Sequence, residues 1–255
     1  MIKIDKIILF SLLIIFGFFG SQFLMAGSPV LKSWEEFETG VRDGLIDKNT
    51  ARQQLPQIMA GLREFAGHYT FQENQKWVFP VKGYGLKSIG GKNGDGYQPD
   101  IVYGTSPIKG YDFFDGNRHG GHPAHDIFVR DKNQDTLDDK TAKQVELIAM
   151  TDSLVLSISQ GWTPSSKLRG GNVVWLYNPR LNMIFYYAHM DKIYVKQGDF
   201  LKAGLPIGTV GRTGLLAWRK QSPTHVHLMV LKCQDNTLKP FNYYKVLENG
   251  YKKAD

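Results

Sequence analysis

The sequence contains only one cysteine, Cys233, among its 255 residues. A single cysteine cannot form a disulfide within the chain, so the fold has to be stabilised by its hydrophobic core, assisted by a metal ion if one is bound. The position of Cys233 also excludes a lipid-anchoring cysteine near the N-terminus. We interpret Cys233 as a buried small residue rather than as a metal ligand.

Residues 1–27 have the composition of an export signal. Two lysines precede an almost uninterrupted apolar run at residues 7–19, and the small residues Ala26 and Gly27 follow it. We therefore expect the protein to be exported to the periplasm or the cell envelope. Cleavage of the signal peptide is the favoured prediction. The alternative is an uncleaved membrane anchor, because residues 7–26 are long enough to span a bilayer.

The sequence also lacks the features of a nucleic-acid-binding protein. Its 31 lysines and arginines outnumber its 24 aspartates and glutamates and give a net charge of +7. These basic residues do not form a dense run interleaved with aromatic residues, and no nucleic-acid recognition motif is present. A moderately basic exported chain suits an anionic polymer as its partner, and an ordinary solvated basic surface explains the charge equally well.

Residues 28–76 are predicted to form a helical N-terminal segment, with the helical pattern running over residues 33–68. Ser33 is suited to cap a first helix, since acidic residues follow it in the first turn. A second helix is expected to begin near residues 47–50, and its apolar residues recur at steps of three and four. We expect this segment to brace the rest of the chain rather than to contact a substrate.

The pattern changes at residue 77, and residues 77–255 are predicted to form a mainly β, antiparallel sheet domain. No convincing helical period appears between residues 141 and 231. Short runs rich in β-branched and aromatic residues alternate instead with turn residues. These predicted strands are residues 145–150, 154–159, 172–178, 183–190, 193–195, 206–210 and 225–231.

The seven histidines are unevenly distributed, and all but His68 fall in or beside three places: His119, His122 and His125; His189; and His225 and His227. Residues an even number apart on a strand face the same side, so His225 and His227 should project into one groove. The same parity puts His122 and Asp126 on one face unless Pro123 bends the segment.

Two imidazoles and one carboxylate from these places provide three protein ligands. Such a set leaves the fourth tetrahedral position open to water, as in a catalytic zinc site. The histidines that do not bind the metal would then serve as acid-base groups. Sharing a metal requires the strands at residues 122–130 and 225–231 to be neighbours in the sheet. In the row of alternate residues that begins at Met183, His189 is expected to end the row on the same face as Phe185 and Tyr187.

These motifs resemble those of the lysostaphin-type, or LytM-like, zinc metallopeptidases, which cut peptide bonds in bacterial peptidoglycan. The resemblance covers roughly residues 78–233, and several separated motifs agree in order and approximate spacing. It rests on His122-x-x-x-Asp126, Tyr187-Ala188-His189 and His225-x-His227, together with residues 170–174, 195–198, 204–208 and 211–214. Ala124, His125 and Arg212 stand where the family commonly has glycine, an apolar residue and serine. None of these departures removes a ligand.

The resemblance implies a LytM-like fold for residues 77–255 and a Zn²⁺ ion held by His122, Asp126 and His227. It further implies that His189 and His225 take the proton of the attacking water, stabilise the oxyanion and protonate the leaving amine. The substrate would be the peptide moiety of peptidoglycan, either stem peptides or crosslinks. The alternative is a catalytically silent wall-binding protein or an activator of another cell-wall hydrolase, although such relatives typically lose metal ligands that this chain keeps.

The remaining histidines carry weaker expectations. His119 and His125 are expected beside the site or at its rim rather than among the ligands. His68 is interpreted as a surface or helix-capping residue. Residues 83–121 contain eleven glycines, so long loops are expected there. In the family such segments form groove walls. Their aromatic residues would either contact substrate or pin the loop to the domain, and the region could also block the groove.

A calcium site is a further hypothesis. Asp131, Asn133 and Asp135 have the spacing that begins a calcium-binding loop. Thr136 stands where that loop needs glycine, and Ala142 stands where a bidentate glutamate would close the site. A solvated acidic hairpin turn is therefore the favoured interpretation.

Overall fold

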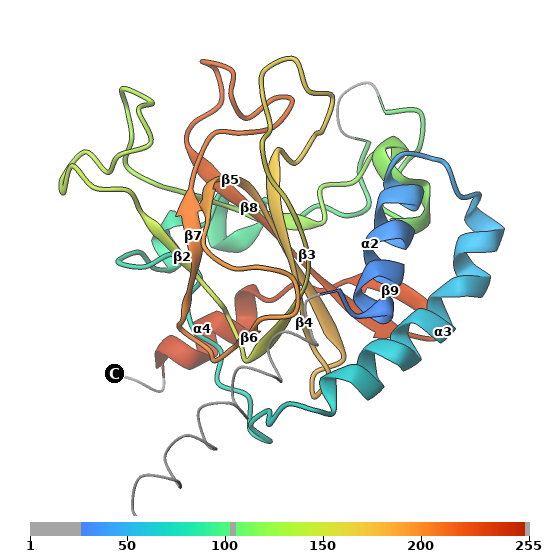
Figure 1. Cartoon of the computed structure of the whole chain (residues 1–255). Helices are drawn as coiled ribbons and strands as arrows, with labels where there is room; N and C mark the ends of the chain where they lie inside the picture. The colour runs from blue at the N-terminus through green and yellow to red at the C-terminus, as the bar shows by residue number, and fades with distance from the viewer. Residues whose placement is uncertain (1–26, 103–105, 253–255) are drawn as a thin grey trace, which may run out of the picture.

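The computed structural model describes residues 27–102 and 106–252. The export signal and the alternative anchor at residues 7–26 lie outside these residues, so both stay predictions. Within the described ranges, no helix combines the length and the apolar character needed to cross a bilayer. A twisted β-sheet occupies the centre of the molecule, with helices α2 and α3 together on one side of it (Figure 1).

The N-terminal helices are α2 (Pro29–Arg42) and α3 (Lys48–Ala66). Helix α3 begins where the sequence predicted, because the Asp47 side chain accepts hydrogen bonds from the backbone N–H groups of Asn49 and Thr50 at 3.0 and 3.1 Å. The predicted start of the first helix is wrong. Pro29 fits the first turn of a helix because its φ is already helical, and the Ser33 hydroxyl donates to the Pro29 carbonyl inside the helix instead of capping it.

Helix α2 packs on the outer face of the sheet. Trp34 is fully buried, and its ring lies 5.8 Å from that of Trp175 in a T-shaped arrangement. Phe37 and Val41 follow Trp34 at helical spacing and are buried in the same cluster, which also contains Leu55 from α3. This packing is what a structural brace requires.

The sheet consists of antiparallel strands in the order β1-β8-β5-β4-β3-β6, with β9 beside β8, and with β7 pairing β5 and β2. This architecture confirms the predicted mainly β, antiparallel fold. The strands are β1 (Ala124–Phe128), β2 (Glu146–Ile148), β3 (Ser153–Ser159), β4 (Asn172–Asn178), β5 (Met183–Ile193), β6 (Phe200–Leu201), β7 (Pro206–Val210), β8 (His225–Gln234) and β9 (Thr237–Pro240).

Residues 83–121 contain little regular structure, as their glycine content predicted. Their described part holds three short 3₁₀ helices: η1 (Leu86–Ser88), η2 (Lys92–Gly94) and η3 (Phe113–Arg118). The sequence pattern did not predict β6, β9 or the C-terminal helix α4 (Tyr244–Lys252). It also separated residues 193–195 from the preceding strand, whereas β5 continues to Ile193.

Two hydrophobic cores lie on opposite faces of the sheet. Phe185, Tyr187 and Val226 belong to the core that also contains residues of α4, whereas Trp175 belongs to the core beneath α2 and α3. Cys233 is buried in the second core, as predicted, and burial raises the pKa of its thiol to about 12.

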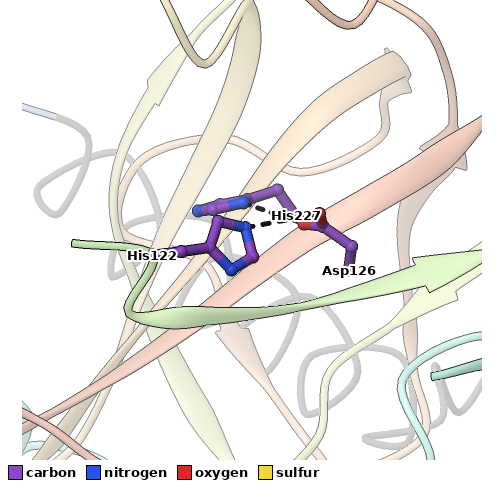
Figure 2. Close-up of side chains that lie close together, drawn as sticks. All are labelled: His122, Asp126 and His227. Atoms are coloured by element: carbon purple, nitrogen blue, oxygen red, sulfur yellow. Dashed lines mark hydrogen bonds and ion pairs between the residues drawn. The ribbon is translucent and has the colours of Figure 1, made fainter. Parts of the chain in front are cut away.

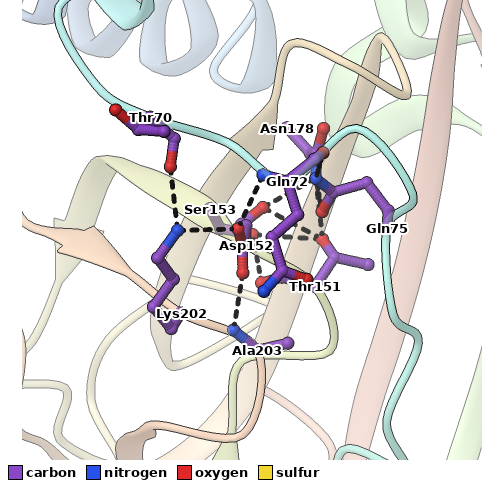
Figure 3. Close-up of polar contacts among 9 residues, drawn as sticks. All are labelled: Thr70, Gln72, Gln75, Thr151, Asp152, Ser153, Asn178, Lys202 and Ala203. Atoms are coloured by element: carbon purple, nitrogen blue, oxygen red, sulfur yellow. Dashed lines mark hydrogen bonds and ion pairs between the residues drawn. The ribbon is translucent and has the colours of Figure 1, made fainter.

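A polar cluster attaches the segment after α3 to the sheet (Figure 3). Asp152 is buried immediately before β3, and its carboxylate accepts hydrogen bonds from the backbone N–H groups of Gln72 at 3.1 Å and Ala203 at 3.0 Å. Lys202 donates to the same carboxylate at 3.1 Å and to the carbonyl of Thr70 at 2.8 Å. The cluster therefore ties three separate chain segments together and fixes where the two N-terminal helices rejoin the sheet.

Replacing Asp152 by alanine is expected to lower the free energy of unfolding by about 2–3 kcal/mol, since three donors lose a charged acceptor. Urea denaturation would measure the change. Asp152→Asn is the matched control, because it keeps one acceptor oxygen and should lose less. A change of less than about 0.5 kcal/mol in the alanine variant would show that the cluster is dispensable.

Candidate metal centre

Two neighbouring strands bring the three predicted ligands together. Strand β1 pairs with β8 so that Asp126 lies directly opposite His227, as a shared metal requires. His122 precedes β1 and reaches the same place (Figure 2). The Nε2 atom of His122 lies 3.3 Å from Oδ2 of Asp126, and Nδ1 of His227 lies 3.0 Å from Oδ1. The three potential ligand atoms all lie within 4.8 Å of one another.

The surroundings prepare these side chains for a cation. The Nδ1 atom of His122 lies 2.8 Å from the carbonyl oxygen of Gly96, and a carbonyl only accepts, so Nδ1 donates to it and Nε2, which faces Asp126, is the nitrogen that would bind a metal on losing its proton. Burial would raise the pKa of Asp126, but hydrogen bonds with His122 and His227 outweigh it and hold that pKa well below its ordinary value. The cluster thus offers an ionised carboxylate and two imidazoles, a donor set that fits zinc.

The two remaining site histidines lie beside this cluster. The Nε2 atom of His225 is 3.9 Å from Oδ1 of Asp126, and the rings of His225 and His189 lie 4.9 Å apart. The Nδ1 atom of His225 faces the carbonyl of Pro223 at 2.7 Å, and Nδ1 of His189 faces the carbonyl of Thr213 at 2.8 Å. Each ring therefore donates through Nδ1 and keeps the Nε2 lone pair for chemistry. Burial, with the nearby His225 and His227, lowers the pKa of His189 to about 3, so this imidazole is neutral.

His189 reaches the site in a way that the sequence did not predict. Alternation along β5 would place it on the face of Phe185 and Tyr187, which are buried in the core on the other side of the sheet. The register between β4 and β5 shifts after Tyr187, and His189 adopts a φ of 65°, in the left-handed region that few residues other than glycine occupy. This bulge turns the imidazole to the opposite face. The prediction of its face was wrong, whereas its approach to the ligand cluster was foreseen.

A cavity of about 290 Å³ opens beside the cluster and contains all five predicted site residues in its wall. The described part of residues 83–121 contributes Tyr111 and Phe113 to that wall. Sequence reasoning missed the contribution of α2, which supplies Glu38, Val41 and Arg42. The one available signal was Glu38 itself, a charged residue four positions after Trp34 in an otherwise apolar stripe.

The weaker histidine predictions concern residues outside the ligand set. His119 lines the cavity, and its ring packs against Tyr111 at 4.6 Å, so it lies at the rim. His125 points away from Asp126 and contacts Asn242 through Nε2 at 3.0 Å. His68 is exposed at the end of α3, where its Nδ1 lies 2.9 Å from the carbonyl of Phe65.

The calcium hypothesis is not supported. The carboxylate of Asp131 accepts hydrogen bonds from the backbone N–H groups of Asp135 and Thr136 and from the hydroxyl of Thr224. Asn133 donates its amide to Asp135 at 2.8 Å. The oxygens that calcium would need therefore stabilise a turn, as in the favoured interpretation. Over residues 27–102 and 106–252, the only cluster that could hold a metal is the one formed by His122, Asp126 and His227.

Comparison with known proteins agrees with the resemblance seen in the histidine motifs. Residues 133–240 match the model of Peptidase family M23. The match includes His189, His225 and His227, whereas His122 and Asp126 precede it. No curated protein matches the chain.

Three solved structures are similar at low identity. The catalytic domain of the antimicrobial peptidase lysostaphin from Staphylococcus simulans is 22% identical over 59% of this chain and 89% of its own, with a TM-score of 0.38. A zinc-containing peptidase from Vibrio cholerae is 21% identical over 67% of this chain and 38% of its own, with a TM-score of 0.40. The catalytic domain of the prophage-encoded M23 protein EnpA from Enterococcus faecalis is 19% identical over 57% of this chain and 89% of its own, with a TM-score of 0.34. All three scores are low, so the family match and the site geometry are the stronger findings.

Proposed function

We propose that this chain, whose residues 133–240 match Peptidase family M23, is a zinc-dependent endopeptidase that hydrolyses peptide bonds in the stem peptides or crosslinks of peptidoglycan. One observation carries the proposal. The ligand atoms of His122, Asp126 and His227 converge beside two further histidines, at a cavity open to a substrate.

The residues divide into two groups with different tasks. His122, Asp126 and His227 would hold the zinc, and the bound ion would act as a Lewis acid that lowers the pKa of water to about 7. His189 and His225 face the same cavity with Nε2 lone pairs. A neutral imidazole can accept a proton from the water that attacks the peptide carbonyl and can then, as imidazolium, donate it to the leaving amine as the C–N bond breaks.

The surrounding chain fixes the orientation of these imidazoles. The carbonyls of Thr213 and Pro223 hold the rings of His189 and His225 through Nδ1. Gly214 permits this approach, because a β-carbon at that position would lie 2.7 Å from Nδ1 of His189. The proton-transfer groups are therefore positioned before substrate arrives.

The proposal includes export to the periplasm or cell envelope, which is inferred from the signal-like residues 1–27. It also includes the division of the rest of the chain into a helical segment, residues 28–76, and a catalytic domain, residues 77–255. A catalytically silent wall-binding protein, or an activator of another cell-wall hydrolase, is the competing function. The complete set of ligands and the open cavity favour the enzyme.

Digestion of purified, crosslinked peptidoglycan tests the proposal. The zinc-loaded protein is expected to release fragments with new peptide termini, identified by mass spectrometry. Chelation should stop the reaction, and added zinc should restore it, since the ligands stay in place. A zinc-loaded protein that sediments with the wall but leaves every crosslink intact would instead establish the silent binder.

A further inference from the structure

A buried carboxylate without a hydrogen bond faces the cavity from helix α2. Glu38 is 5% exposed and lines the cavity together with Val41 and Arg42. Among the residues that the structure describes, its carboxylate makes one ion pair, with Arg42 at 4.0 Å, and no hydrogen bond. Buried charges are normally paired and hydrogen-bonded, so an ionised Glu38 would gain from a cation that enters the cavity.

Arg42 does not supply that cation. Its Nε and one terminal nitrogen donate to the two carboxylate oxygens of Asp43 at 2.9 and 2.7 Å, a bidentate pair that directs these donors to Asp43 rather than to Glu38. Burial raises the pKa of Glu38 to about 7, against the weaker opposing charge of Arg42. The ionised form of Glu38 is consequently under-compensated in the free protein.

Tyr186 connects Glu38 to the candidate metal centre. Its ring lies 6.4 Å from the ring of His227, and it lines the same cavity as Glu38. Glu38, Arg42 and Tyr186 line the same cavity as the ligand cluster. A substrate group that reaches Glu38 would therefore occupy the same cavity as the ligand cluster.

We propose that Glu38 is a specificity-determining residue that receives a free protonated amino group of the substrate peptide. This inference rests on the proposed function. The substrates of the endopeptidase would then be peptides that carry an unmodified amine near the scissile bond. An ammonium fits because it is a compact cation with three donors, and the Glu38 carboxylate accepts no hydrogen bond from the described chain beyond its 4.0 Å ion pair with Arg42. A carboxylate would be repelled, and a neutral group would leave the buried charge uncompensated.

The test compares fluorescently labelled, crosslinked peptidoglycan fragments in two forms, with their amines free or acetylated. The zinc-loaded full chain is mixed with each form in a stopped-flow instrument, and affinity is taken from the fluorescence anisotropy reached before cleavage products form. Acetylation removes the positive charge but leaves the peptide backbone intact. We expect it to weaken binding by about tenfold or more in the wild type and by less than about twofold in Glu38→Gln.

Glu36→Gln is the matched control, since Glu36 is an exposed acid on the same helix, paired with Lys32. It should discriminate between the two forms as the wild type does. Equal binding of both forms by the wild type would overturn the proposal. So would a Glu38→Gln variant that loses affinity for both forms to the same extent, because that result indicates a role in shape alone.

Cleavage is followed separately in the same samples by mass spectrometry. Discrimination in binding without any cleavage would support the amine site and contradict the endopeptidase. Cleavage without discrimination would do the reverse, so the two proposals fail independently.

Discussion

Replacing His189 by alanine is expected to slow peptide hydrolysis by about 10²–10⁴-fold while the protein still binds zinc, because proton transfer is lost and the ligands are kept. His189 lies 4.9 Å from His225 by ring centres and is absent from the cluster of converging ligand atoms. The measurement pairs initial rates on crosslinked peptidoglycan fragments with the zinc content of the purified variant.

His227→Ala is the matched variant with the opposite expectation. It removes a ligand atom 3.0 Å from Asp126, so zinc affinity should fall by at least about 100-fold, and activity should fall with it. Excess zinc should partly restore the His227 variant and leave the His189 variant unchanged. Loss of zinc from both variants would place His189 among the ligands and remove it from the proton-transfer role.

Glu38→Gln is expected to stabilise the protein by about 3 kcal/mol at pH 8, even though it removes the proposed recognition group. Burial raises the pKa of Glu38 from 4.5 to about 7, so the folded state favours the protonated acid. As the pH rises above 4.5, the unfolded chain releases this proton first and the wild type loses stability, until the full penalty is reached above about pH 7. Glutamine resembles the protonated acid and avoids the loss.

Urea denaturation of both proteins at pH 8 and pH 5 checks this expectation. At pH 5 the difference should fall below about 1 kcal/mol, because Glu38 is then mostly protonated when folded and only partly ionised when unfolded. An equal difference at both pH values would show that packing, and not the charge, separates the variant from the wild type. A destabilised variant at pH 8 would mean that Arg42 compensates Glu38 in the folded protein.

The sequence predicted the parts of this site that depend on local periodicity. His225 and His227 share a face because β8 is regular, and Asp126 lies opposite His227 because β1 and β8 pair, as the predicted ligand set required. The face of His189 could not be predicted in the same way. A register shift in β5 depends on its pairing with β4, and such long-range pairing leaves no mark in the alternation of one strand.

Local sequence pattern likewise could not predict that α2 contributes to the cavity wall. The helical N-terminal segment was predicted to brace the rest of the chain, but the sequence did not indicate which face of the sheet it covers or that Glu38 would line the cavity. The start of α2 at Pro29 also could not be predicted from the local sequence alone. Proline and Ser33 both favour a helix start, and only the folded chain shows which of them was used.

The bulge in β5 separates two structural requirements, core packing and the orientation of an imidazole, that a regular strand would have to meet on one face. Tyr187 faces the core that also contains residues of α4, and His189, two residues later, faces the cavity. Substitutions that repack the core at Tyr187 can therefore accumulate without rotating the imidazole, and changes around the groove need not disturb that core. The packing of Tyr187 and the orientation of the His189 imidazole can therefore change independently of each other.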